Sequence, residues 1–167
     1  RGCIYHLDIR PEHLADTVIT VGDPGRVPLV SKYFDKITHQ SQHREFVCHA
    51  GRIGRKEVLV VSTGIGPDNI DIVMNELDAL ANIDFDSRTL KPVPKALSII
   101  RLGTCGSLHA DVPVGATVTS SYGIGMDNLL QYYRYETNAD ERFIMDNFMQ
   151  HTRLAGSNIV PYIAEGS

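Results

Sequence analysis

The residues best suited to chemistry lie in one short stretch, where an apolar run at residues 97–102 contains Arg101 and ends at Gly103-Thr104-Cys105-Gly106. A short run rich in Ile and Leu that stops at glycine predicts a buried strand. An arginine near the end of an inner strand is costly unless an anion meets it. Glycine lets the backbone approach a ligand closely, and Thr104 adds a hydroxyl. The stretch therefore predicts an oxyanion pocket. The alternative is an arginine paired with an internal carboxylate beside an ordinary glycine turn.

A second glycine turn follows the β-branched run at residues 17–21, which predicts a strand. Asp23 can cap the helix expected over residues 27–34, and Pro24 suits the first turn of that helix. Free amides after Gly22 would point to the helix entrance, where an anion is favoured, and Arg26 lies one turn in. The alternative at this position is a plain capped turn with a solvated arginine.

A third glycine turn, Ser62-Thr63-Gly64-Ile65-Gly66, ends an apolar strand expected at residues 56–63, in the middle of a sheet. A further strand is expected at residues 43–53. Asp68 is expected to cap the next helix. The apolar face of that helix is core, and it consists of Ile70, Val73, Met74, Leu77, Leu80 and Ala81.

The remainder of the chain continues the alternation of strands and helices. Residues 82–96 predict a surface connection, residues 116–122 a strand, and residues 159–163 the start of another strand. A helix is expected to begin at Asn138 or Asp140, and its inward residues would be Ile144, Met145, Phe148 and Met149. We expect an α/β fold and a single domain over residues 1–167.

Composition and charge indicate which partners, locations and metal sites are unfavourable for this protein. The 167 residues are 43% hydrophobic and 22% charged, and the net charge of −4 makes a nucleic-acid polymer or an acidic membrane surface an unfavourable partner. The sequence contains no long apolar run and no secretory pattern at its start, so we expect a cytoplasmic protein. Three widely spaced cysteines, Cys3, Cys48 and Cys105, predict neither a disulfide framework nor a zinc site. The histidines at 39, 43 and 49 do not share one face convincingly, and we predict no metal site there.

Four motifs follow one another along the chain: Val21-Gly22-Asp23-Pro24-Gly25-Arg26-Val27, His43-Arg44-Glu45-Phe46, Ser62-Thr63-Gly64-Ile65-Gly66 and Ile100-Arg101-Leu102-Gly103-Thr104-Cys105-Gly106. In this order they resemble the motifs of nucleoside phosphorylases of the uridine phosphorylase and hexameric purine nucleoside phosphorylase type. The resemblance covers essentially the whole chain and implies a central mixed β-sheet flanked by helices.

The resemblance also implies roles for individual residues. The phosphate site would consist of Gly22, Arg26, Arg101 and Thr104, with Arg101 and Thr104 acting in catalysis and Arg44 supplied by a neighbouring subunit. His6 would reach across the same interface to the ribose 5′-hydroxyl, and Cys105 and Gly106 would lie beside the base and sugar. Glu45, Ile65 and Asn69 are weak candidates for a monovalent cation site, because Asn69 stands where serine is expected. Inorganic phosphate is a co-substrate, and no other cofactor is implied.

The activity implied is phosphorolysis of uridine or a related pyrimidine nucleoside to free base and ribose 1-phosphate. Such an enzyme is a glycosyltransferase of nucleoside metabolism and would form a homodimer or hexamer with shared active sites. Arginines can hold phosphate in line for attack on a ribosyl group with oxocarbenium character, so no covalent nucleophile is required. Three arginines at matching positions disfavour hydrolysis by water. A purine nucleoside phosphorylase is the alternative, because Cys105 within its glycine motif resembles the purine branch.

Members of this family continue beyond the strand at residues 159–163. The further segments bind the base and hold the ribose 2′- and 3′-hydroxyls through a Glu-Met-Glu motif, which this chain lacks. We therefore expect the C-terminal portion to be absent, and the chain to be part of a longer protein. The alternative, from another class, is a truncated paralogue that binds phosphate or nucleoside without catalysis.

Overall fold

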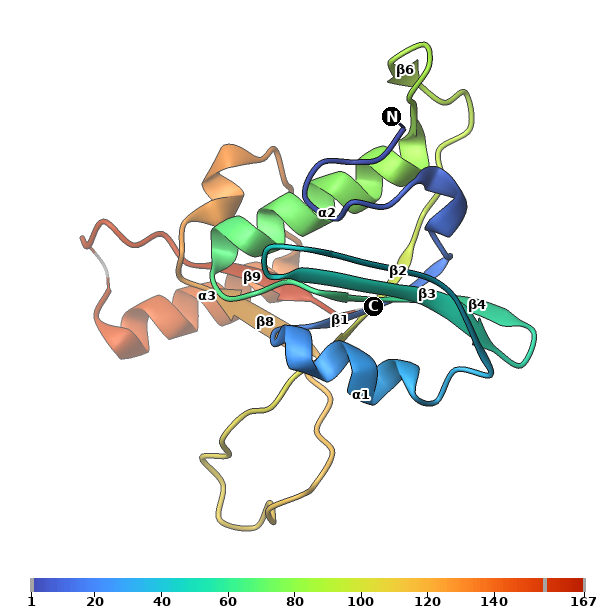
Figure 1. Cartoon of the computed structure of the whole chain (residues 1–167). Coiled ribbons are helices and arrows are strands. Elements are labelled where there is room, and N and C mark those ends of the chain that lie inside the picture. Colours follow the sequence, from blue (N-terminus) through green and yellow to red (C-terminus); the bar gives the residue numbers. More distant parts are fainter. Residues whose placement is uncertain (1, 155, 167) are drawn as a thin grey trace. The chain divides into compact units, whose positions relative to one another are not determined.

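The computed structural model describes residues 2–154 and 156–166, and the chain divides into two compact units, Arg1–Cys105 and Gly106–Ser167 (Figure 1). The sequence predicts one domain over residues 1–167. Each unit has its own sheet pairing, so the two are described one after the other.

The first unit is built on a five-stranded mixed sheet, which confirms the predicted α/β fold with a central mixed sheet. Its strand order is β2-β3-β4-β1-β7. Strand β1 pairs in parallel with both β4 and β7, and β2, β3 and β4 pair in antiparallel fashion. The strands are β1 (Thr17–Val21), β2 (Lys36–His43), β3 (Phe46–Ile53), β4 (Lys56–Ser62) and β7 (Ser98–Leu102).

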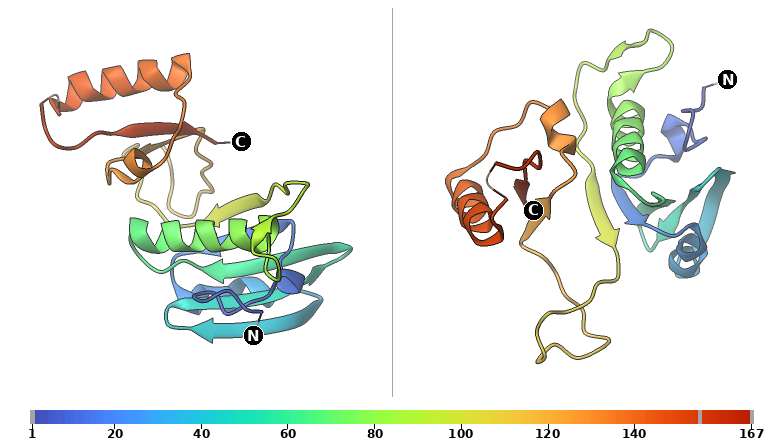
Figure 2. Two further views of the ribbon diagram at one scale, coloured as in Figure 1. Left: turned by 90° about the horizontal axis from the view of Figure 1, so that it is seen from above. Right: turned by 90° about the vertical axis from the view of Figure 1, so that its left-hand side faces the viewer.

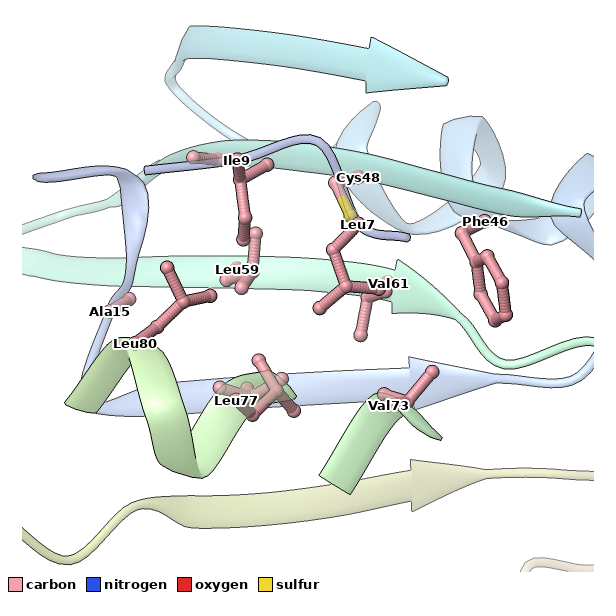
Figure 3. Packing of buried hydrophobic residues seen from close by; sticks show 12 residues of the cluster. Leu7, Ile9, Ala15, Phe46, Cys48, Leu59, Val61, Val73, Leu77 and Leu80 are labelled. Atoms are coloured by element: carbon pink, nitrogen blue, oxygen red, sulfur yellow. The ribbon is translucent and has the colours of Figure 1, made fainter. Parts of the chain in front are cut away.

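Two helices pack on opposite faces of this sheet, α1 (Val27–Ser31) and α2 (Pro67–Asn82) (Figures 1 and 2). Strand β4 is apolar on both sides for this reason: Leu59 and Val61 belong to the core cluster under α2, and Val58 and Val60 belong to the cluster that includes Val27 of α1. Figure 3 shows Val73, Leu77 and Leu80 of α2 facing the sheet. The apolar stripe predicted for this helix is therefore core at Val73, Leu77, Leu80 and Ala81, whereas Met74 is partly buried and Ile70 is exposed.

The N-termini of the two helices are capped in different ways. Asp23 Oδ1 accepts a hydrogen bond from Gly25 N at 2.8 Å and caps a short 3₁₀ turn, Pro24–Arg26 (η2), that leads into α1, as predicted. Helix α1 ends at Ser31, before the predicted residue 34. The predicted cap of α2 is wrong, because Gly66 occupies the capping position and Asp68 lies within the first turn.

The N-terminal segment is packed into the core, which the sequence does not reveal. Leu7 and Ile9 are fully buried, and a short 3₁₀ turn, Pro11–His13 (η1), leads from them to β1. Glu76 of α2 holds the segment, because its carboxylate accepts hydrogen bonds from the backbone amides of His6 and Leu7, each at 2.9 Å. Burial of two aliphatic side chains and these charge-assisted bonds order the segment without a partner strand.

Other differences from the sequence predictions concern elements with weak patterns. Strand β2 has mostly polar side chains and was not expected before residue 43. The connection at residues 82–96 contains a small hairpin of β5 (Ile83–Asp84) and β6 (Thr89–Leu90). Strand β7 forms where expected, but its five residues are exposed rather than buried. It pairs only with β1 in the described part of the chain, so it is an edge strand.

The second unit contains β8 (Tyr122–Gly125), a 3₁₀ turn (Leu129–Tyr132, η3), α3 (Ala139–Thr152) and β9 (Tyr162–Glu165). Asn138, one of the two predicted starts of the helix, caps α3 in a reciprocal arrangement with Glu141. The inward residues predicted for α3 form its half-buried face. The strand predicted at residues 116–122 is wrong, because pairing with β9 begins only at Tyr122. None of the described helices is long and apolar enough to cross a membrane.

Two imidazole rings connect the N-terminal segment to the sheet. His13 and His39 of β2 are stacked, with 3.6 Å between ring centroids and an angle of 9° between ring planes. Burial lowers the pKa of His13, and the neighbouring His39 lowers it further. Nε2 of His39 is buried and has no hydrogen-bond partner within residues 2–154 and 156–166.

We therefore expect acid to destabilise the first unit. A histidine whose pKa is lower in the folded state binds a proton more readily when unfolded, so the free energy of unfolding should fall as the pH drops from about 7.5 to about 5.5. Denaturant unfolding at both pH values measures this dependence. A His13→Phe variant keeps a ring in the stack without the titrating group, and its pH dependence should be weaker. An equal pH dependence in the variant would contradict the role of this pair.

Candidate active site

Three glycine turns converge at one edge of the first sheet, as predicted. The parallel register aligns Val21 of β1 with both Ser62 of β4 and Leu102 of β7, so the three strands end together. The turns that follow surround a cavity of about 650 Å³. The cavity is lined by Gly22, Asp23, Pro24, Arg26, Glu45, Gly64, Ile65, Asn69, Arg101, Gly103 and Thr104.

Thr63 holds two of these turns together from within the protein. This residue is 1% exposed, and its amide donates to the carbonyl oxygen of Val21 at 2.8 Å. Its hydroxyl oxygen lies 3.1 Å from the carbonyl oxygen of Gly64, to which it donates. The turn after β4 is thus fixed to the end of β1 before any ligand binds.

Arg26, Arg101 and Thr104 form the cationic part of the cavity. Arg26 Nη2 donates to Thr104 Oγ1 at 3.2 Å, so the hydroxyl proton of Thr104 remains available to an anion. A Cβ atom on Gly22 would stand 3.4 Å from Arg101 Nη2, so the bare backbone of this glycine lies against the guanidinium. Within the described residues neither arginine forms an ion pair with a carboxylate, which disfavours the internal-carboxylate alternative. Two guanidiniums and a hydroxyl facing one cavity are suited to an oxyanion.

The turn between β2 and β3 carries Arg44 and Glu45, whose side chains do not share a site within this chain. Glu45 lines the cavity, whereas Arg44 is exposed and does not. Arg44 has a φ of +54°, a left-handed conformation that is unfavourable for a residue with a side chain. Ser62 fixes the turn, because its hydroxyl donates to Glu45 O at 2.6 Å and accepts from Val47 N at 2.7 Å.

The candidate cation ligands fit a cation poorly. Glu45, Ile65 and Asn69 do line the cavity together. However, Nδ2 of Asn69 donates to the carbonyl oxygen of Ile65 at 3.1 Å, so the N–H side of this amide, rather than its oxygen, faces that carbonyl. A Cβ atom on Gly64 would stand 2.7 Å from the same amide nitrogen, so a donor group fills this space. Cations take oxygen ligands, and an amide N–H group repels them.

The remaining predicted residues lie outside the cavity of this chain. Cys105 follows Thr104 but does not line the cavity, and Gly106 is the first residue of the second unit. His6 lies in the N-terminal segment, where its ring meets the rings of Tyr5 and Phe46 edge to face. Nδ1 of His43, in strand β2, donates to Tyr5 O at 3.1 Å, so His6 and the Arg44 turn belong to neighbouring parts of one surface.

The histidines at 39, 43 and 49 serve separate structural roles. His39 stacks on His13, His43 bonds to Tyr5, and His49 Nδ1 forms a hydrogen bond with the hydroxyl of Ser31 at 2.7 Å. In the described residues no group of three or more His, Cys, Asp or Glu side chains could hold a metal ion. The structural roles of Ser62, Thr63 and Glu76 were not predicted. Glu76 gave little signal, because its place beside the apolar stripe of α2 does not indicate that it binds the N-terminal segment.

Comparison with known proteins agrees with this geometry. The model of the phosphorylase superfamily matches residues 16–162, and the chain belongs to this superfamily. The chain is 29% identical to the uridine phosphorylase of Thermococcus kodakarensis over 136 residues, which are 81% of this chain and 44% of that protein. It is also 29% identical to the uridine phosphorylase of Escherichia coli over 126 residues, 74% of this chain and 44% of that protein. The chain thus spans less than half the length of these relatives.

A solved structure gives the same result for the fold. The nucleoside phosphorylase of Trypanosoma brucei, described as showing uridine phosphorylase activity, matches with a TM-score of 0.87 and 38% identity. The match covers 99% of this chain and 56% of that one. The resemblance inferred from the four motifs is confirmed.

The buried hydroxyl of Ser62 generates a stability prediction. Ser62→Ala removes the acceptor of the Val47 amide and the donor to Glu45, so the free energy of unfolding should fall by about 1–3 kcal/mol. Denaturant unfolding measures the change, and Ser87→Ala in the exposed β5–β6 hairpin serves as the control. A loss as small as that of the control would show that the turn does not depend on Ser62.

Proposed function

We propose that the protein containing this chain cleaves uridine or a related pyrimidine nucleoside with phosphate. The observation that carries the proposal is the pair of guanidiniums of Arg26 and Arg101, without a carboxylate partner in the described residues, facing one cavity with Thr104. The choice of a pyrimidine follows the uridine phosphorylases among the relatives. The products would be the free base and ribose 1-phosphate.

The proposed reaction assigns a task to each group. Phosphate would bind between Arg26, Arg101 and the hydroxyl of Thr104, with the bare backbone of Gly22 leaving room beside the guanidinium. A phosphate oxygen forms a bond to the anomeric carbon as the bond from that carbon to the base nitrogen breaks. The electron pair of the broken bond leaves with the base, which then takes up a proton. The arginines orient the phosphate and balance its charge close to the oxocarbenium-like sugar.

A test compares phosphate use in matched arginine variants of the full-length protein. Arg101→Ala deletes a charge-assisted partner of the oxyanion, so kcat/KM for phosphate should fall by about 100-fold or more while nucleoside binding changes little. Release of base from uridine, thymidine and inosine, with and without phosphate, measures this.

Arg55→Ala, in the exposed turn after β3, is the control for loss of positive charge. Base release without phosphate would favour a nucleosidase instead. Equal weakening of both substrates by Arg101→Ala would indicate a structural arginine.

We further propose that two copies of the chain share their sites. Arg44 and His6 lie outside the cavity of their own chain, on neighbouring parts of one surface. A two-fold interface brings the same surface of each copy to the other, so each cavity would receive both residues from its neighbour. Arg44 would then add a third guanidinium to the phosphate site.

Mixing two inactive variants tests the shared site. Arg44→Ala and Arg101→Ala proteins, each impaired alone, should regain activity when their subunits exchange. In a mixed dimer one site carries both changes and the other carries neither, so about half of the sites in such dimers are intact. The activity of the mixture after denaturation and refolding together gives the measurement. Confirmed subunit exchange without recovered activity would place Arg44 in the site of its own chain.

A further inference from the structure

The ring of His6 has one nitrogen engaged and one free. Nδ1 lies 2.7 Å from Glu76 Oε1, and the same carboxylate accepts the backbone amides of His6 and Leu7. No hydrogen bond is made to Nε2 within the described residues. The Glu76 side chain is 12% exposed and that of His6 is 26% exposed, so water competes little for the carboxylate.

A carboxylate can only accept hydrogen bonds, and this fixes the position of the proton on the ring. Nδ1 must carry the hydrogen that Glu76 receives, which leaves the lone pair of the neutral ring on Nε2. The rings of Tyr5 and Phe46, with centroids 4.8 and 5.9 Å from that of His6, limit rotation of the imidazole. The free edge of His6 is therefore a hydrogen-bond acceptor.

We propose that Glu76 is a positioning residue that makes His6 select nucleosides whose sugar carries a hydroxyl able to donate a hydrogen bond. The inference rests on the proposed function and its shared site, with His6 meeting the ribose 5′-hydroxyl in the neighbouring chain as the family resemblance implies. Nε2 would accept the hydroxyl proton. A phosphate or a halogen in place of that hydroxyl brings only lone pairs to Nε2, so it is disfavoured.

The substitution Glu76→Gln weakens this preference without changing the size of the side chain, because a ring that donates from Nε2 can bond to the lone pairs of the sugar substituent. One carboxamide oxygen can still accept the amides of His6 and Leu7, which lie 3.1 and 2.9 Å from Oε2 of Glu76. The NH₂ group then faces Nδ1 and donates to it, so the ring hydrogen moves to Nε2. In this orientation the variant loses the bond from the His6 amide to Oε1, keeps one acceptor for each of the two amides, and turns the free edge of His6 into a donor.

The experiment uses the full-length protein labelled with ¹⁵N-histidine. Nitrogen chemical shifts should show His6 protonated on Nδ1 in the native protein and on Nε2 in Glu76→Gln. The ratio of kcat/KM for uridine to that for 5′-deoxy-5′-fluorouridine, whose fluorine cannot donate, should fall about tenfold in the variant. Asp78→Asn removes an exposed charge two residues along α2 and should leave both readouts unchanged.

The possible outcomes separate this inference from the proposed function. A native ring protonated on Nε2, or a reversed tautomer with an unchanged ratio, would overturn the inference. If Glu76→Gln fails to fold in a thermal unfolding measurement, the nitrogen shifts of native His6 test the role of Glu76, and His6→Ala tests the role of the ring, because an unchanged ratio in that variant would overturn the inference. Failure of the native protein to cleave any nucleoside with phosphate would overturn the proposed function and its sugar selectivity. The NMR measurement would still decide whether Glu76 fixes the ring.

Discussion

The structure of the site depends on the parallel pairing of β1 with β4 on one side and β7 on the other. One residue, Val21, is aligned with the last residue of both neighbours, so the chain leaves the sheet three times at the same edge. Arg26 and Arg101 are far apart in the sequence, and only this register brings them to one cavity. A shift of one residue in either pairing would separate the turns and reverse the faces of a strand that is packed on both sides.

Buried polar groups stabilise the turns at the ends of these strands, and Ser62 and Thr63 supply these groups. Both are at most 1% exposed, and both satisfy backbone groups of other turns. Arg44 has a left-handed backbone that costs a residue with a Cβ atom about 1–2 kcal/mol. The hydrogen bonds of Ser62 to the two sides of that turn offset this cost. The unfavourable conformation is thus maintained from the sheet rather than by the turn itself.

The sequence predicted well where a pattern was strong and local. The bounds of β1, most of the core stripe of α2 and one of the two predicted starts of α3 follow from β-branched runs, helical spacing and capping chemistry, and the structure confirms them. Strand β2 could not be predicted, because pairing with β3 orders it despite its polar side chains. Leu7 and Ile9 form too short a pattern to reveal their burial.

The candidate site was only partly predictable for a related reason. The pattern of a glycine directly after a strand predicts turns at Gly22, Gly64 and Gly103, and all three glycines line the cavity. Glu76 gave little signal, because its hydrogen bonds to His6 and Leu7 depend on where the N-terminal segment lies. The roles proposed for His6 and Arg44 rest on the family resemblance alone.

The turn between β2 and β3 restricts how this protein can diverge. Arg44 and Glu45 are adjacent, yet only Glu45 lines the cavity. The left-handed backbone at Arg44 separates the two side chains, so inserting or deleting one residue here would change the turn that places Glu45 at the cavity. The same change would disturb the hydrogen bonds of Ser62 to Glu45 and Val47 on either side of the turn. Over evolutionary time, this turn can change residue types much more easily than it can change length.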